Sequence, residues 1–390
     1  MNQGRTVFAQ VIQHAPHKAL QRCVERYPGV RRSRSFTCWD QFLCLVFAQL
    51  TFRESLRDIE ACLGARAGAA LSHGHPVRRL TQHAGRRQRE AELAHLRRLR
   101  PGVLIKEAQR LYAEDSFALE LAETVYALDS TTIDLCLSLF PWAQFRRTKS
   151  AIKLHTVLDL RGNIPSFLRV TDGRTSDVSQ LDDLPLEAGA IYVMDRGYVD
   201  FARLYRFTLA QASFVVRAKK NLRFKRRYSH EVDRSTGLIC DQTIVLVTAR
   251  SLEGYPEPLR RVRSRDPETG KRITLLTNNF RLSAWEVAEL YRCRWQVELF
   301  FKWIKQHLRI KAFYGTSDNA VKTQIWIAIS TYVLVAILKK HLKTELSLYT
   351  MLQILSVTLF QKVELSQAFS CAKSQMPEEP TCNQLQFFDL

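Results

Sequence analysis

The sequence predicts a mixed α/β core that is flanked along the chain by helical regions and contains a β-rich insertion. Three apolar runs follow one another and have the pattern of strands, and a strand, a helix and another strand come next. This order of elements is typical of a mixed sheet covered by helices. The expected strands are residues 125–128, 152–160, 164–170, 190–194 and 213–217, and the expected helix is 201–211.

The chain carries far more positive than negative charge. Its 58 Lys and Arg residues outnumber 38 Asp and Glu, which gives a formal net charge of +20 over 390 residues. An excess of this size favours a polyanionic partner, with nucleic acid ahead of an anionic membrane. The alternative is a protein that is merely basic.

Cysteine usage and apolar patterning bear on the compartment. The nine Cys include no C-x-x-C pair, which argues against a zinc module or a disulfide framework and fits a reducing cytosol. The first ten residues, MNQGRTVFAQ, lack the apolar core of a signal peptide. The longest apolar run, 325–338, is short for a membrane span, so we expect a buried helix there, a cytoplasmic protein and no membrane partner.

The first 70 residues have a helical pattern. The segment 36–63 predicts an apolar helix, a short break near 50–52 and a second amphipathic helix. Three arginines precede it: Arg31, Arg32 and Arg34. Two helices with a tight joint and basic flanks fit a helix-turn-helix DNA reader, and an ordinary helical hairpin is the alternative.

Residues 74–102 break the pattern. They read GHPVRRLTQHAGRRQREAELAHLRRLRPG, a run crowded with Arg and His that has no clean period. A solvated or disordered face and a phosphate-binding arm are two interpretations. A third is a pair of compensating frameshifts, because suitable codons read one nucleotide later can spell SRSTLADANEKRNWRIYADFAQ, which resembles an ordinary helical segment.

Two carboxylates stand where apolar strands end. A helix is expected around 105–114, and the strand 125–128 then runs into Asp129, while the strand 190–194 runs into Asp195. Open α/β sheets place their sites at strand ends. An aspartate there is also a common turn or cap residue. A short helix is expected at 176–184, and residues 221–280 form the β-rich insertion.

A third carboxylate lies on a predicted helix at 291–308, reading YRCRWQVELFFKWIKQHL. At about 100° per residue, Tyr291, Arg294, Glu298 and Lys305 fall within one polar stripe roughly 60° wide, beside an apolar stripe. The apolar stripe would pack the helix and hold Glu298 among cations. The alternative for these four residues is a solvated charged face with pairing at helical spacing.

Three carboxylates brought together suit hard divalent cations. They would repel one another unless cations intervene, and oxygen ligands favour Mg²⁺ or Mn²⁺. Two such ions, about 3.5–4 Å apart, can activate an attacking oxygen and stabilise the leaving oxygen of a phosphodiester. The sequence therefore predicts a two-ion site at Asp129, Asp195 and Glu298, with Mg²⁺ as the ion and Mn²⁺ as a substitute.

The spacing Tyr291-x-x-Arg294-x-x-x-Glu298-x-x-x-x-x-x-Lys305 resembles the signature of DDE transposases of bacterial insertion sequences, the insertion-sequence-four group. The strings LDSTTIDL at 128–135 and MDRGY at 194–198 resemble the first and second Asp motifs of that family. Further resemblance lies in three segments: KLHTVLDLRGNIPSFLRVTDGRTSDV at 153–178, FAQLTFRESLRDIE at 47–60 and the final QLQFFDL.

The resemblance implies a ribonuclease-H-like core and a division of the chain. It assigns a helical DNA-binding region to 1–115, the catalytic core to 116–220 plus 281–340, the insertion to 221–280, and a helical region and tail to 341–390. It also implies that Asp129, Asp195 and Glu298 bind two metal ions and that Tyr291, Arg294 and Lys305 hold phosphates.

The activity that the resemblance implies is cut-and-paste transposition. Water would attack at the transposon end, and the 3′-hydroxyl released would attack target DNA, directly or after a hairpin on the opposite strand. Transposon-end and target DNA would be the partners of a homodimer associated with the bacterial nucleoid. The alternatives are an inactive DNA-binding relic and a metal-dependent nuclease of the same fold.

Other basic residues are weaker candidates for DNA contact. Lys153 and His155 lie on one expected strand, where simple packing is the alternative for His155. Arg217, Lys219 and Lys220 end another strand and begin a basic run that continues through 225–227, which favours backbone contact with DNA over an idle solvated face. The remaining carboxylates of the core are not expected to bind metal: Asp134, Asp159, Asp172 and Asp177.

Overall fold

The computed structural model describes residues 5–15, 17–18, 37–65, 102–115, 119, 121–266 and 269–373. Arg31, Arg32, Arg34, the anomalous stretch 74–102 except for Gly102, and the final QLQFFDL lie outside the described residues. The chain divides into two compact units, one of residues 1–104 and 307–390 and the other of 105–306. This division groups 307–340 with the N-terminal helices, whereas the sequence pattern grouped them with the core.

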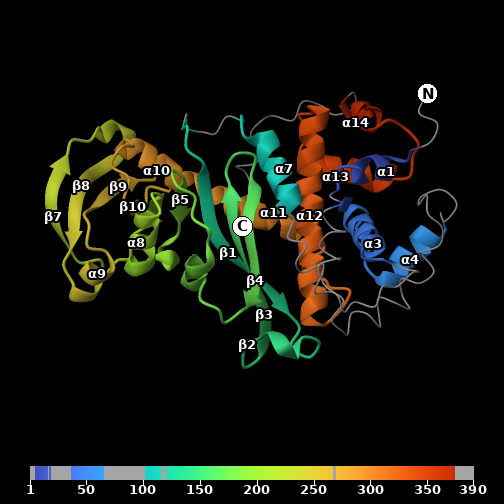
Figure 1. Cartoon of the computed structure of the whole chain (residues 1–390), viewed down its shortest axis with the longest axis horizontal. Helices are drawn as coiled ribbons and strands as arrows, with labels where there is room; N and C mark the ends of the chain where they lie inside the picture. Colours follow the sequence, from blue (N-terminus) through green and yellow to red (C-terminus); the bar gives the residue numbers. More distant parts are fainter. Residues whose placement is uncertain are drawn as a thin grey trace. The chain divides into compact units, whose positions relative to one another are not determined.

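The second unit is built on one ten-stranded sheet (Figure 1). Its path runs β2-β3-β1-β5-β6-β10-β9-β8-β7, and β4 pairs with the free side of β3. The strands are β1 (Val125–Leu135), β2 (Gln144–Arg146), β3 (Lys149–Asp159), β4 (Ile164–Asp172), β5 (Ile191–Met194), β6 (Ser213–Arg217), β7 (Phe224–His230), β8 (Leu238–Leu246), β9 (Leu259–Arg265) and β10 (Arg272–Thr277).

The half of the sheet that the sequence predicted has the expected ribonuclease-H-like order. β4, β3 and β1 pair antiparallel, and β1, β5 and β6 pair parallel. The crossover from β5 to β6 uses α8 (Phe201–Leu209). The insertion does not form a separate layer, because β10 pairs antiparallel with β6 and extends the same sheet through β9, β8 and β7.

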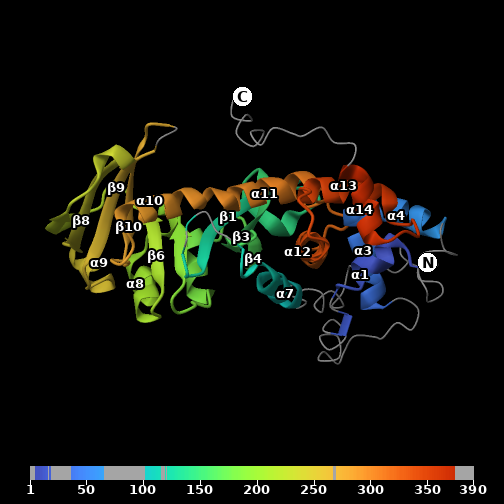
Figure 2. The same cartoon turned by 90° about the horizontal axis from the view of Figure 1, so that it is seen from above.

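Helices cover both faces of this sheet. In Figure 2, α10 (Ala284–Cys293) and α11 (Trp295–His307) run along one face, and α8 lies on the other. The expected capping box opens α10, where Ser283 and Glu286 exchange hydrogen bonds. The other helical elements of the unit are α7 (Gly102–Tyr112), α9 (Ala249–Gly254) and the 3-10 turns η3 (Pro141–Ala143), η4 (Asp177–Asp183), η5 (Arg196–Tyr198) and η6 (Arg234–Thr236).

The prediction of one continuous helix over 291–308 is wrong in one respect. Regular α-helix stops at Cys293 and resumes at Trp295, so that Arg294 stands at a joint. Its amide donates to the Tyr291 carbonyl, three residues back, and its own carbonyl accepts from the Val297 amide. The tighter turn keeps the two helices in line (Figure 2). The four residues of the polar stripe therefore still lie along one side, with a local change of helical pitch at Arg294.

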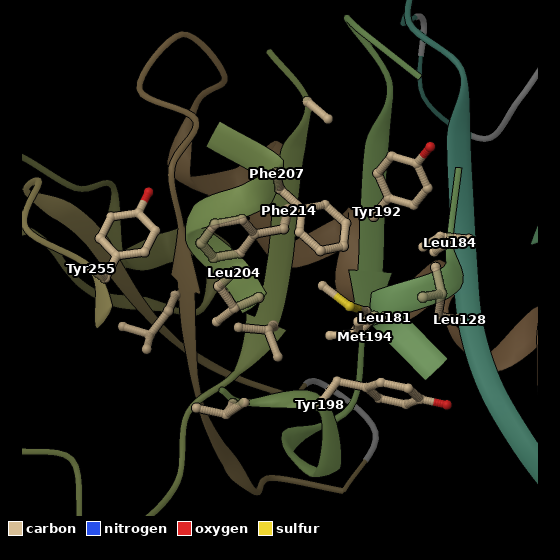
Figure 3. Close-up of a cluster of buried hydrophobic side chains, with 14 of the residues drawn as sticks. Leu128, Leu181, Leu184, Tyr192, Met194, Tyr198, Leu204, Phe207, Phe214 and Tyr255 are labelled. Carbon is tan, nitrogen blue, oxygen red and sulfur yellow. The ribbon is translucent and has the colours of Figure 1, made fainter. Parts of the chain in front are cut away.

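An apolar core fills the space between the sheet and α8 (Figure 3). Leu128 of β1, Met194 of β5 and Val216 of β6 all contribute to this core. Side chains alternate between the faces of a strand. The residues that follow these three therefore face the opposite side of the sheet, on which α10 and α11 lie.

The first unit is helical. It contains α1 (Val7–Ile12), α3 (Cys38–Leu50), α4 (Leu56–Gly64), α12 (Asp318–Leu342), α13 (Leu348–Thr358) and α14 (Leu365–Lys373). The predicted pair of helices with a break near residue 51 is present as α3 and α4, and Phe52 has a φ of 55° in that break. α12 is long and apolar enough to cross a membrane, but 94% of its most apolar stretch is buried inside the protein, as a core helix would be.

Candidate active site

Two of the three predicted carboxylates stand side by side because of strand register. Leu128 of β1 pairs with Met194 of β5, and Met194 pairs in turn with Val216 of β6. Asp129, Asp195 and Arg217 are the next residues along these three parallel strands. They form a row across three interior strands, part-way along β1 and at the carboxyl ends of β5 and β6, on the face of α10 and α11.

The third carboxylate reaches this row from α11. The Arg294 guanidinium donates to Asp129 Oδ2 at 2.8 Å and to Glu298 Oε1 at 2.5 Å. Its side chain is only 13% exposed, so both ion pairs are partly shielded from water. One cationic group, 165 residues from Asp129 in sequence, therefore joins the strand carboxylate to the helix carboxylate.

The environment of Asp129 disfavours its charge. Burial raises the pKa of its carboxyl from 3.8 to about 6, even though Arg294 and the Ser130 amide act in the opposite direction. The nearby charges of Glu298 and Asp195 add to the increase. A desolvated carboxylate with two like charges close by is stabilised when a cation approaches.

Tyr291 connects α10 to the second strand carboxylate. Its hydroxyl lies 3.4 Å from Asp195 Oδ1, and the Arg294 guanidinium lies 5.8 Å from the centre of its ring. Burial raises the pKa of Tyr291, and the neighbouring Arg294 and Arg217 counteract this. The phenol is therefore a neutral hydrogen-bond donor within a ring of charges.

Lys305 lies further along α11 and contacts β1. Its ammonium donates to Thr131 Oγ1 at 2.5 Å and to the Thr132 carbonyl at 2.8 Å. Thr131 is two residues from Asp129 and so lies on the same face of the sheet. The Tyr-Arg-Glu-Lys spacing thus places all four side chains against β1 and the carboxyl end of β5.

Lys153 and His155 lie on the opposite face. Across the β1–β3 ladder they pair with Thr132 and Ser130, which alternate with Asp129 and Thr131. His155 is 2% exposed, and burial lowers its pKa to about 4, so its ring is neutral at pH 7. This burial leaves the expected DNA contact of His155 without support, and we correct its assignment to a packed residue behind the site.

The basic residues after β6 divide into two groups. Arg217 belongs to the row with Asp129 and Asp195, and its charge lowers the pKa of Tyr291. Lys219 and Lys220 are exposed, although the Lys219 ammonium donates to the Val199 carbonyl at 2.9 Å. Of these three residues, Lys220 and the exposed part of Lys219 extend toward the basic run at 225–227, which is also exposed.

In the part of the chain that the structure describes, no three His, Cys, Asp or Glu side chains already stand in an arrangement that could hold a metal ion. The Arg294 guanidinium occupies the space between two of the predicted ligands. The donor set itself is suitable, because it consists of carboxylate oxygens, which hard divalent cations prefer as ligands.

Comparison with known proteins identifies the family. A family model described as the transposase DDE domain matches residues 120–334, which is more than half of the chain. The chain belongs to the DDE transposase family. It is therefore a DNA transposase, a polynucleotidyl transferase whose partner is DNA and whose chemistry depends on divalent metal ions. A second family model, described as a domain of unknown function (DUF4372), matches residues 3–74.

Individual relatives agree with this assignment. A protein of Sinorhizobium fredii named as a transposase, y4zB, is 33% identical over 242 residues, which are 61% of this chain and 67% of that protein. The protein of Geobacillus stearothermophilus named as a transposase for insertion sequence element IS5377 is 32% identical over 232 residues, 58% of this chain and 60% of that protein. A protein of Synechocystis named for element IS4SA is 23% identical over 252 residues, 64% of this chain and 67% of that protein.

A solved transposase structure is among those that the chain resembles. The piggyBac transposase synaptic complex with hairpin DNA aligns with a TM-score of 0.42 and 10% identity, over 96% of this chain and 81% of that chain.

Sequence reasoning missed the residues that lie behind the transposase carboxylates, on the face of the sheet opposite α10 and α11. Ser130, Asp177 and Tyr198 lie next to Asp129 and Asp195, and Asp177 was set aside as a non-ligand. The alternation of β1 and β3 could have placed Ser130, Lys153 and His155 on one face. Nothing in the local pattern indicates that η4 brings Asp177 to them.

Proposed function

We propose that Asp129, Asp195 and Glu298 hold two divalent cations, Mg²⁺ with Mn²⁺ as a substitute, while this transposase cleaves and joins DNA. The observation that supports this assignment most is the bridge from Asp129 through Arg294 to Glu298, beside Asp195 on the adjacent strand. When bound, the two ions would activate the attacking oxygen and stabilise the leaving oxygen of a phosphodiester.

Arg294, Tyr291 and Lys305 would bind the DNA backbone at the bond that is cut. Arg294 would leave the two carboxylates and neutralise nonbridging phosphate oxygens, as a bidentate donor can. The Tyr291 hydroxyl would donate a hydrogen bond to the same phosphate. Arg217, Lys219 and Lys220 would contact the backbone further away and set the position of the duplex.

The reaction that these groups support is hydrolysis at a transposon end followed by strand transfer. Hydrolysis releases a 3′-hydroxyl, which attacks a phosphodiester of target DNA, or first the opposite strand to form a hairpin. Because two ends must be cut and joined together, we propose a homodimer as the working assembly. We place the protein in the bacterial cytoplasm, at the nucleoid.

The charge-neutral substitution Glu298→Gln tests the metal assignment. It should abolish cleavage of end DNA and weaken Mn²⁺ binding, while the affinity for end DNA in metal-free buffer stays within about twofold, because the lost charge serves the cation and not the phosphate. The matched control is Glu289→Gln on α10, whose carboxylate pairs with Arg292 at 3.0 Å on the exposed side of the helix. Cleavage at the wild-type rate by Glu298→Gln would refute the assignment.

The products distinguish this function from its alternatives. With end DNA, target DNA and Mg²⁺, joined products support the transposase reading. Cleavage without joining supports a nuclease, and binding without cleavage supports a relic.

The relic reading has one observation in its favour. The match to the second family model ends at residue 74, where the anomalous stretch 74–102 begins. We propose that two compensating frameshifts bracket this stretch. Sequencing the gene tests the idea directly. If the adjacent reading frame does not encode a helical segment over these residues, the idea is wrong. A frame-restored variant should bind end DNA more tightly than the present chain.

A further inference from the structure

The face of the sheet behind the metal site carries a compact polar cluster centred on Asp177 of η4. One of its oxygens, Oδ1, accepts hydrogen bonds from Ser130 Oγ at 2.7 Å and from Lys153 Nζ at 3.2 Å. His155 Nδ1 lies 3.6 Å from the same oxygen. Side chains of β1 and β3 thus converge on a single carboxylate that belongs to neither strand.

This cluster is connected to the first strand carboxylate through Ser130. The backbone amide of Ser130 donates to Asp129 Oδ1 at 2.8 Å, and the other oxygen, Oδ2, faces Arg294. When Asp177 fixes the Ser130 hydroxyl, it also limits how the adjoining peptide can turn. It therefore influences which oxygen of Asp129 faces the metal site.

The cluster also reaches the second strand carboxylate. Tyr198 lies three residues after Asp195 and is buried beneath Met194 (Figure 3), and the nearby Ser130 side chain acts to lower its pKa. Burial, reinforced by nearby carboxylates that include Asp129 and Asp177, raises its pKa well above the usual range, so it stays a neutral phenol. Ser130 thus lies near the turn after β5, on the strand that carries Asp129.

Lys153 balances the charge of this cluster. Its ammonium is held between Asp177 and the Thr175 carbonyl, which is 3.0 Å away, and its side chain is 16% exposed. An ammonium held in this way from the rear face supports the cluster and does not extend toward the carboxylate face. The expectation that Lys153 contacts DNA is therefore replaced by a role as the partner of Asp177.

We propose that Asp177 is a positioning residue for metal binding, which acts on Asp129 and Asp195 through Ser130 from the rear face of the sheet. This inference rests on the proposed function of those carboxylates. Residues one layer behind a metal ligand commonly contribute about 10–100-fold to metal affinity or activity. The contribution here comes from hydrogen bonds, so an amide that keeps the accepting oxygen should retain most of it.

The test compares Asp177→Ala, Asp177→Asn and the control Asp183→Ala in the full-length protein. Asp183 lies on the same 3-10 turn and pairs with Arg169, away from Ser130. Mn²⁺ binding is measured without DNA by electron paramagnetic resonance, and end-DNA affinity and thermal unfolding are measured in parallel. We expect Asp177→Ala to weaken Mn²⁺ binding about 10–100-fold, and Asp177→Asn and Asp183→Ala to stay within about threefold of wild type.

Several results would overturn the inference. One is Mn²⁺ binding by Asp177→Ala at the wild-type level, and another is an equal loss in Asp183→Ala, which would indicate general loosening of η4. An equal loss in Asp177→Asn would show that charge matters and hydrogen bonding does not. If Asp177→Ala does not fold, Ser130→Ala takes its place with the same expected loss.

Failure of the proposed function gives a different pattern. In that case Glu298→Gln would bind Mn²⁺ as tightly as the wild type, whatever the variants at Asp177 do. The two hypotheses can therefore be separated within one set of titrations.

Discussion

Ionisation of Asp129 should lower the free energy of unfolding, and this effect can be measured. Burial raises its pKa from 3.8 to about 6 in the folded protein. The carboxyl group therefore binds its proton more tightly when the protein is folded, and ionisation destabilises the fold. The difference in pKa corresponds to about 3 kcal/mol, at roughly 1.36 kcal/mol for each pKa unit. This destabilisation is absent below pH 3.8 and complete above about pH 6.

Replacing Asp129 with Asn removes this cost. In metal-free buffer we expect Asp129→Asn to gain stability over wild type as the pH rises from about 4 to above 6, by up to about 3 kcal/mol at pH 8. Asn keeps an oxygen that can accept from the Ser130 amide. Urea denaturation at a series of pH values, with a chelator present, gives the difference between the two proteins directly.

Asp159 provides the matched control. It is the last residue of β3, where burial likewise raises its pKa to about 6, and hydrogen bonds from the Arg161 amide and Gln109 partly offset this. Asp159→Asn should show the same pH dependence. Adding Mn²⁺ should cancel the difference at Asp129, because a bound cation stabilises the ionised form, and should leave Asp159 unchanged. A difference at Asp129 that is independent of pH, or an equal response to Mn²⁺ at both positions, would refute this reasoning.

Three further predictions concern the scaffold and the DNA surface. Arg294→Ala should lower the free energy of unfolding of the metal-free protein by about 2–4 kcal/mol, because two partly buried carboxylates lose their cation, and Arg294→Lys should recover part of it in the same denaturation assay. Gly162→Ala should lower the melting temperature more than Gly189→Ala. Both have positive φ, at 74° and 82°, but of these two only Gly162 has a neighbour, the Tyr112 ring, that an added Cβ would strike. Lys220→Ala should reduce the slope of log affinity for DNA against log salt by about 0.9, and an unchanged slope would exclude a phosphate contact.

The strands of the core were predictable because their signal is local. Apolar runs that lead into Asp129 and Asp195 specify the strands, and parallel pairing then brings the two carboxylates together. The expected strand end at Asp129 is wrong, because β1 continues to Leu135 through its pairing with β3. The Tyr-Arg-Glu-Lys stripe was predictable from helical period and from resemblance. These are features in which neighbours in sequence determine the geometry.

The features that were missed depend on contacts between distant segments. The sequence around the break at Arg294 contains no Gly or Pro that would predict it. The break coincides with the two ion pairs that Arg294 forms with Asp129 and Glu298. The grouping of Lys153 and His155 with Asp177 depends on how η4 follows β4. Local propensity carries no information about either arrangement, because tertiary contacts determine both.

The arrangement of charges at the site predicts that DNA and metal bind cooperatively. Arg294 holds two of the three carboxylates, so a cation and the guanidinium compete for Asp129 and Glu298 in the free protein. A phosphate that draws Arg294 away would remove this competition, and a cation that replaces Arg294 would free it for phosphate. Linkage requires the coupling to be reciprocal, so end DNA should tighten Mn²⁺ binding by the same factor by which Mn²⁺ tightens end-DNA binding. Titrations of each ligand with and without the other measure that factor, and in Arg294→Ala the part due to this exchange should be lost. A factor of one in the wild type would show that Arg294 does not exchange partners.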